Sequence, residues 1–364
     1  KRAFLLESEP GGTRVSLMLR EMGLVASLAR PYAEDPRAAN LVGFPKRDAT
    51  HWRSASWRDS DAGYAGGRFA MDINVIWVPA ALESIATILD VLPSLGFTLQ
   101  AQDSIAHGTG ATPLAGYART PTSLRRALDV WKRARRHFEV SLPPAVIRQR
   151  TGAKLAWLPE SERHYWRNVL AQHGEVKDSL TFLVLSLDGA GRPIRVANTD
   201  PATELFLADT ADQATVLKDI APFLRPYPVG LLVEGLGPLV ANDAYASRAI
   251  WERFQADAYH GPRVVWGREV NLFLLGIANH IARTANQRDR GQADAEYLHD
   301  LQGAMHHILD AVNASGLQHN ELWSYEITGE KLVPVRYGTS SDVQLWNTTN
   351  LVVQYVLSKL PATN

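Results

Sequence analysis

Three segments of this chain combine carboxylates, arginines and aromatic residues at points where loops give way to predicted helices. The first reads S-W-R-D-S over 56–60 and continues as G-G-R-F-A-M-D-I-N over 66–74. Its polar and aromatic side chains are Trp57, Arg58, Asp59, Arg68, Asp72 and Asn74. The helix dipole stabilises a carboxylate at a helix start. Asp72 is therefore either a helix cap or a reactive acid.

The second segment reads A-Y-H-G-P-R-V-V-W-G-R-E over 258–269. Its side chains suited to a polar pocket at a helix start are Tyr259, His260, Trp266 and Arg268. Taken alone, His260 fits a hydrogen-bonding loop residue better than a base or a ligand. No second histidine lies at metal-ligand spacing from it, and the adjacent His306 and His307 point in different directions on a helix. The sequence therefore predicts neither a metal nor a cofactor.

The third segment reads N-E-L-W-S-Y-E over 320–326 and places Glu321 beside Trp323, between two predicted helices. A later Q-L-W-N begins at Gln344 in the last predicted helix. A glutamate on a surface loop is the alternative interpretation of Glu321. Glu234, in V-E-G-L-G-P, is a reserve candidate for an acid.

Helical periodicity dominates the elements that would position these segments, because apolar residues recur at steps of three and four. Helices are predicted over 75–92, 122–138, 160–172, 210–223, 241–254, 264–285, 293–314 and 341–357. The stretch 179–187 is instead rich in β-forming residues. The turn sequence D-G-A-G at 188–191 and a return over 192–197 follow it, which predicts a β-hairpin.

This series of helices, joined by long aromatic loops, predicts a mainly α fold over one domain, residues 1–364. The expected architecture is a toroid of helical hairpins of the (α/α)6 type, decorated by the small β-hairpin. Loops at one end would form the pocket, with Trp57, His260 and Trp323 at that end. Periodicity fits an α-solenoid equally well. The N-terminal hairpins look abbreviated, which leaves open an upstream portion.

The composition narrows the classes of partner. The 38 basic and 38 acidic residues balance to zero net charge, which disfavours binding to nucleic acid or to an anionic membrane. The absence of cysteine excludes disulfides and thiolate chemistry. No uninterrupted apolar run of about 18 residues occurs, so we expect no membrane span. The periplasm and the cytoplasm of a bacterium both suit such a chain.

The order of these motifs resembles the (α/α)6-barrel glycosidases: the glucoamylases, the glucosidase half of glycogen-debranching enzymes and the processing α-glucosidases. The likeness extends over roughly residues 50–360. It implies that Trp57, Arg58 and Asp59 bind the terminal sugar, and that the loop from Tyr259 to Trp266 lines the pocket. It further implies Asp72 as general acid and Glu321 as general base. The interval between Asp59 and Asp72 is short for such motifs.

The resemblance thus implies an inverting, exo-acting glycoside hydrolase on oligosaccharides, with α-glucosides as the expected substrates. In that chemistry one carboxyl protonates the leaving oxygen while another, roughly 6.5–9.5 Å away, activates water. Arg58→Ala is expected to weaken substrate binding while leaving the fold intact. The alternatives are a phosphorylase, a β-glucanase or an epimerase on the same scaffold, or a non-catalytic α-solenoid that binds sugars or proteins.

Overall fold

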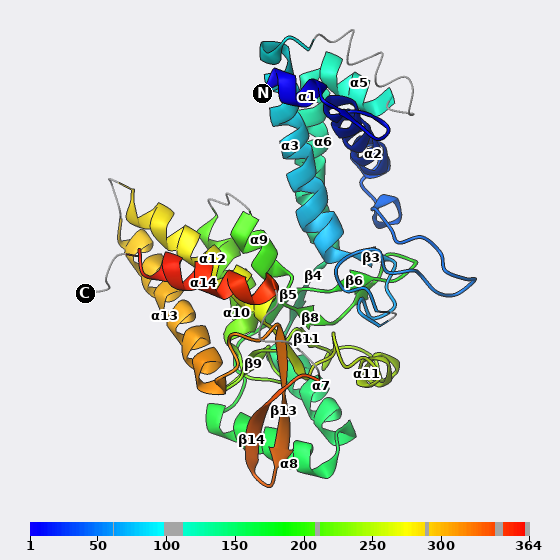
Figure 1. The fold of residues 1–364 in the computed structure, drawn as a ribbon. Helices are drawn as coiled ribbons and strands as arrows, with labels where there is room; N and C mark the ends of the chain where they lie inside the picture. Colours follow the sequence, from blue (N-terminus) through cyan, green and yellow to red (C-terminus); the bar gives the residue numbers. More distant parts are fainter. Residues whose placement is uncertain (61, 98–111, 208–211, 288–290, 339–344, 361–364) are drawn as a thin grey trace. The chain divides into compact units, whose positions relative to one another are not determined.

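The computed structural model describes residues 1–60, 62–97, 112–207, 212–287, 291–338 and 345–360. The protein is mainly helical, with several small antiparallel sheets, in agreement with the predicted α class (Figure 1). The chain forms two compact units. The first unit comprises residues 1–45, 68–137 and 187–192, and the second comprises 46–67, 138–186 and 193–364.

The first unit is a group of helices packed lengthwise. Its α-helices are α1 Arg2–Leu6, α2 Arg14–Glu34, α3 Val78–Val91, α5 Thr112–Arg119 and α6 Pro121–Lys132. Its short strands are β1 Ser8–Glu9, β2 Gly12–Thr13 and β3 Phe69–Ala70. Helix α2 packs against α3, α5 and α6 (Figure 1). At their centre the buried Trp131 ring lies 4.6 Å from Tyr32 and donates a 3.0 Å hydrogen bond to the carbonyl of Ala29.

Helix α3 extends in both directions beyond its α-helical part. A π-helix, Asp72–Trp77, precedes it and a 3-10 turn, Leu92–Leu95, follows it. Pro79 follows the π-helix closely, so this proline, which has no backbone N–H, lies where the π-helix passes into the α-helix. The continuous segment Asp72–Leu95 is long and apolar enough to cross a membrane by length and composition, although helices of soluble cores share this property. By length and composition one segment could therefore span a membrane, whereas the sequence analysis expects no such span.

The second unit carries most of the chain. Its helices are α7 Pro144–Trp157, α8 Glu160–His173, α9 Pro201–Leu207, α10 Gln213–Leu224, α11 Arg248–Gln255, α12 Gly267–Ala285, α13 Gln292–Ser315 and α14 Leu345–Leu357. Its strands are β4 Glu139–Leu142, β5 Leu180–Leu183, β7 Pro193–Ile194, β8 Ala197–Asn198, β9 Leu232–Val233, β10 Gly237–Pro238, β11 Ala241–Asn242, β12 Val264–Trp266, β13 Leu322–Thr328 and β14 Lys331–Arg336. Strand β6, Ser186–Leu187, lies at the boundary between the units.

Helix α12 organises the core of the second unit, since it packs against α9, α13 and α14. Gly276 permits the contact with α9, because a Cβ there would lie 2.8 Å from the Leu205 Cβ. Strand β12, which leads directly into α12, pairs antiparallel with β13, and β13 pairs with β14. The start of α12 is thereby fixed against a three-stranded sheet.

Most predicted helices are confirmed, among them those near 122–138, 160–172, 210–223 and 293–314. The turn at 188–191 is also confirmed, with the Asp188 backbone N–H bonded to the carbonyl of Arg192. The predicted hairpin is confirmed next to the turn, where β6 pairs with β7 and the Leu185 N–H bonds to the Val196 carbonyl, but β5 pairs with β4 instead. Helices α2 and α7 are additional to the prediction.

Two predicted helix starts and one predicted loop are wrong. Residues 241–242 form β11, and α11 begins only at Arg248, because the Asn242 side chain accepts from the Ala244 backbone and turns the chain. Residues 264–266 form β12 before α12 begins. The segment after Glu321 is the β13–β14 hairpin rather than a loop. Residues 341–344, where the last helix was predicted to begin, lie outside the described residues.

Candidate functional site

An aromatic cluster in the second unit joins two of the predicted functional segments. The Trp57 ring lies 5.8 Å from His260 and 5.6 Å from Trp266, edge to face in both cases. The His260 and Trp266 rings are stacked, 5.9 Å apart and nearly parallel. Two guanidinium groups lie over the Trp57 ring, Arg58 at 4.3 Å and Arg268 at 5.0 Å from its centroid. The segment 56–60 and the segment 258–269 therefore form one site.

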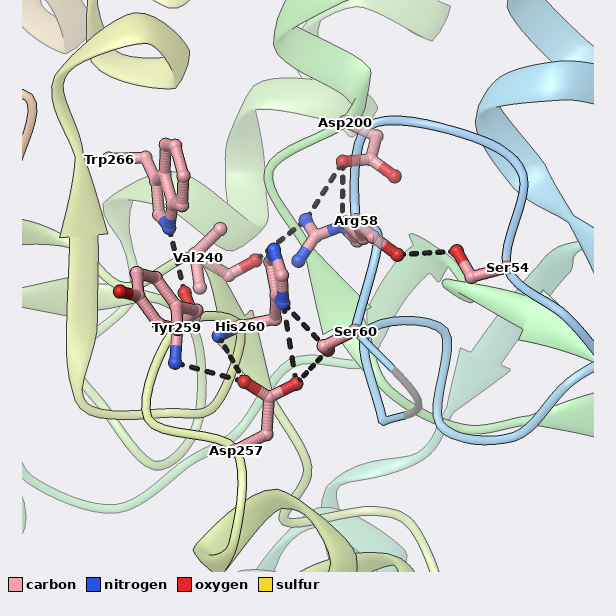
Figure 2. A network of polar contacts seen from close by, with 9 residues as sticks. All are labelled: Ser54, Arg58, Ser60, Asp200, Val240, Asp257, Tyr259, His260 and Trp266. Carbon is pink, nitrogen blue, oxygen red and sulfur yellow. Dashed lines mark hydrogen bonds and ion pairs between the residues drawn. The ribbon is translucent and has the colours of Figure 1, made fainter.

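Arg58 lies beneath this cluster as half of a buried ion pair. Its side chain is fully buried, and its Nη2 donates to Asp200 Oδ1 at 2.8 Å and to the Val240 carbonyl at 3.1 Å (Figure 2). The neighbouring Asp59 is exposed. The burial of the Arg58 guanidinium against Asp200 and Val240 does not fit the predicted contact with sugar hydroxyls, whereas the exposed Asp59 stays a predicted substrate-binding residue.

The pair is positioned by two short strands. Asp200 lies between β8 and α9, in the sequence T-D-P, and Val240 directly precedes β11. Because β8 and β11 pair antiparallel, Asp200 and the Val240 carbonyl converge on one guanidinium. Arg58 Nη1 and Asp200 Oδ2 are buried without a hydrogen-bond partner among the described residues. Buried polar atoms of this kind are ordinarily satisfied by water or a ligand.

Ser60, Asp257 and His260 form a second polar group, in which Ser60 and Asp257 lie beside the His260 ring (Figure 2). Ser60 Oγ hydrogen-bonds to Asp257 Oδ2 and lies 2.9 Å from His260 Nδ1. Burial alone would raise the pKa of Asp257, but the bonds from His260, Ser60 and the Tyr259 backbone outweigh it and lower this pKa to about 2. In a nucleophilic triad, serine and aspartate bind opposite ring nitrogens. Here both lie beside Nδ1, so the group is a loop anchor.

Glu269 is the buried carboxyl of the site. It lies in the first turn of α12, is 1% exposed, and its Oε1 is 3.3 Å from Arg268 Nη1. Burial raises the pKa of Glu269 to about 7; Arg268 and Arg58 oppose the rise, and Asp200 adds to it. A carboxyl with this pKa can hold a proton near neutral pH and release it in a reaction.

Glu321 joins the site through its backbone. Its carbonyl accepts a 2.8 Å hydrogen bond from the N–H of Gly267, two residues before Glu269. Gly267 makes this approach possible, because a Cβ there would lie 2.7 Å from the carbonyl oxygen of Asn320. The Glu321 side chain is half-buried. The third predicted segment therefore begins beside the start of α12, together with the second.

Trp323 has a different role from the one predicted. Its ring is completely buried between strands, and its indole N–H donates a 3.0 Å hydrogen bond to the Leu236 carbonyl. A ring without exposed surface cannot stack on a substrate, which corrects its assignment as a substrate-binding residue. Tyr259 is instead 51% exposed, and its carbonyl accepts from the Trp266 indole at 2.7 Å.

Asp72 and Arg68 belong to the first unit. Asp72 is buried and is the first residue of the π-helix, whose N-cap is Met71, so the predicted capping role is not observed. Arg68 is half-buried, with its guanidinium 4.7 Å from the Phe69 ring. Glu234 is an exposed turn residue between β9 and β10, bonded at 2.8 Å to His307.

A cleft of about 840 Å³ lies along the same loops. Its lining includes Arg47, Trp52, Ser60, Arg253, Asp257 and Tyr259. Gly66 also lines it, with a φ of +73°, and a side chain there would collide with the Arg253 guanidinium. The volume suits an oligomeric ligand, since pockets of about 300–1,000 Å³ hold drug-sized molecules.

Two residues of the site, Asp200 and Glu269, were not singled out from the sequence. Asp200 stands before a proline, where T-D-P reads as an ordinary helix start. Glu269 ends the second segment and reads as a favourable first-turn carboxylate. A glutamate followed by V-N-L-F-L-L-G-I, a largely apolar stretch, was the available signal that this carboxyl would be buried.

Comparisons with protein-family models, with curated proteins and with solved structures find no match for this chain. Within the described ranges, no group of three histidine, aspartate or glutamate side chains is placed to hold a metal ion.

Proposed function

We propose that this protein is a glycoside hydrolase, with its site formed by the loops around Trp57, His260 and Trp266. The observation that carries the proposal is the aromatic cluster packed directly on buried, charged, hydrogen-bonding groups. Sugars present apolar ring faces as well as hydroxyl groups. A site that combines half-exposed rings with the partly exposed guanidinium of Arg268 complements both kinds of surface.

Two carboxyls supply the chemistry in this proposal. Glu321 acts as the general base that activates water. Glu269 is the candidate for the general acid within the second unit, because a buried glutamate can hold its proton near neutral pH. Since only 1% of Glu269 is exposed, it passes that proton to the leaving oxygen through one bridging water rather than by direct contact. Asp72, in the first unit, is the alternative candidate for that general acid, because the resemblance to the (α/α)6-barrel glycosidases implies it. Protonation of the leaving oxygen and attack by water then cleave the glycosidic bond with inversion.

The finer architecture in this proposal is the (α/α)6 toroid, and the family is that of the glucoamylase-like glycosidases. Motif order supports both, and the helical content is compatible with them. Exo-acting cleavage of α-linked glucosides is the corresponding activity. A phosphorylase would use the same scaffold with phosphate in place of water, and it is distinguished by its product.

A hydrolysis screen tests the proposal. Purified protein is incubated with α- and β-linked gluco-oligosaccharides, with and without inorganic phosphate, and released sugars are quantified. We expect free monosaccharide from α-linked substrates without phosphate, and a loss of about 100- to 10,000-fold in Glu321→Gln. Glu326→Gln, which alters an exposed carboxylate on β13 five residues after Glu321, is the matched control and should retain full activity. The proposal fails if no glycoside is cleaved, or if both variants behave alike.

A further inference from the structure

A second pocket in the second unit is enclosed by α7, α8, α11, the loop at 257–263 and β13. Its volume is about 220 Å³. That is below the roughly 300–1,000 Å³ typical of drug-sized ligands. It shares Asp257 and Ala258 with the larger cleft but is otherwise lined by different residues. The occupant must therefore be small.

The walls of this pocket are aromatic on two sides. Trp157 and Trp251, with ring centroids 5.7 Å apart, form one side, and the buried Tyr227 and Tyr325 form another. Tyr337 also lines the pocket, and its ring lies 5.0 Å from that of Tyr259, which lines the cleft. Rings and phenolic hydroxyls together provide apolar surface and hydrogen-bonding groups.

Each charged group of the pocket already has an ion-pair or hydrogen-bond partner within the protein. Lys154 Nζ lies 2.8 and 2.9 Å from the two carboxylate oxygens of Asp243, and both side chains are buried. Glu162 is paired with Arg263. Asp257 accepts hydrogen bonds from backbone N–H groups and from Ser60. Both cationic side chains of the lining, Lys154 and Arg263, are thus already paired with carboxylates and offer no free positive charge to an anionic ligand, so this lining favours a neutral one.

We propose that this pocket binds a single neutral sugar ring, at a site separate from the cleft. A monosaccharide matches the small volume, the aromatic walls that suit an apolar ring face, and the paired carboxylates and tyrosine hydroxyls that suit its hydroxyl groups. The pocket retains the sugar without acting on it, and its occupancy does not depend on the proposed hydrolysis.

Ligand-observed NMR and titration calorimetry with glucose, mannose, galactose and the acyclic polyol sorbitol test this inference on the full chain. We expect a cyclic sugar to bind with a dissociation constant in the millimolar range and sorbitol to bind more weakly. Tyr227→Phe should weaken binding about fivefold, the usual effect of one lost hydrogen bond. Trp157→Ala should weaken it more strongly, and circular dichroism melting checks that both variants fold.

Trp52→Ala, which alters only the cleft, is the matched control and should bind the sugar with unchanged affinity. Three results overturn the inference: none of the sugars binds, sorbitol binds as well as the best ring, or Tyr227→Phe and Trp52→Ala have equal effects. Glu321→Gln separates this inference from the proposed function. If Glu321→Gln binds the sugar but the wild-type protein hydrolyses no glycoside, the hydrolase proposal fails and the sugar pocket stands. If the wild-type protein hydrolyses glycosides but no sugar binds in the pocket, the pocket inference fails and the hydrolase proposal stands.

Discussion

The indole rings of Trp57 and Trp266 meet edge to face, with centroids 5.6 Å apart and planes at 75°. This contact joins two loops that are distant in sequence, and both rings are half-buried. Aromatic pairs in this geometry contribute about 0.5–1.5 kcal/mol beyond the area that they bury. The part of each ring that stays exposed is the surface on which the proposed substrate would stack.

The first prediction concerns Trp266. Trp266→Ala removes the proposed stacking surface and leaves the buried Arg58–Asp200 pair in place. We expect kcat/KM on oligosaccharides to fall about tenfold or more, because one aromatic contact is lost. Steady-state kinetics measure the change, with Trp52→Ala, which alters a residue that lines the cleft, as a comparison. Unchanged kinetics in Trp266→Ala would remove the aromatic cluster from the site.

Trp323 should respond differently, because its ring is a core residue. Trp323→Ala should destabilise the protein by about 3–5 kcal/mol, the usual cost of deleting a buried tryptophan. Trp323→Phe should cost less, and the folded fraction should keep its activity. Urea denaturation gives the free energy of unfolding. A stable Trp323→Ala protein with lost activity would restore the substrate-binding role.

A third prediction replaces the one made for Arg58 from sequence. Arg58→Ala leaves the Asp200 carboxylate buried without its partner, which costs about 3–5 kcal/mol of stability. The double variant Arg58→Met/Asp200→Leu should recover much of that loss, because neither charge is then buried. Both are measured by urea denaturation. A fully stable Arg58→Ala protein with weaker substrate binding would support the original expectation instead.

The pH dependence of Glu269 gives a fourth prediction. Because burial raises its pKa to about 7, the general acid is lost as pH rises through 7, and kcat/KM should fall on the alkaline side. The folded state binds this proton more tightly than the unfolded state, whose pKa is near 4.5. Its contribution to stability is therefore fully present below pH 4.5 and is lost as pH rises toward 7.

Glu269→Gln should abolish the alkaline limb of the pH–rate profile and flatten the pH dependence of stability, with Glu326→Gln as the unaffected control. Full profiles of kcat/KM and of the urea midpoint measure both effects. An alkaline limb that persists in Glu269→Gln would assign the acid to another carboxyl, with Asp72 as the next variant.

The sequence predicted which segments would carry the site better than it predicted the role of each side chain. Aromatic and charged residues at helix starts identified Trp57, His260 and Trp266, and the structure brings these together. The same reasoning could not show that Arg58 and Trp323 point inward. Local pattern indicates which segments carry aromatic and charged residues, whereas the direction of a side chain depends on the strands that pack beside it.

The helices illustrate the same limit. The long apolar stripe of α13 is visible in the sequence, because a helix that buries one face requires it. Strand β12 was read as helix because three residues, Val264–Trp266, carry no periodicity of their own. Its conformation comes from pairing with β13, more than fifty residues away in the sequence.

The most direct measurement of the central claim is NMR of the first anomer released from an α-linked gluco-oligosaccharide. The account predicts β-glucose as the first product, formed by direct attack of water opposite the leaving group. Glu321→Gln should lose this reaction, and azide should restore part of the rate by replacing the water as nucleophile. Release of α-glucose first would show a retaining mechanism, and no release from any glycoside would contradict the assignment of a hydrolase.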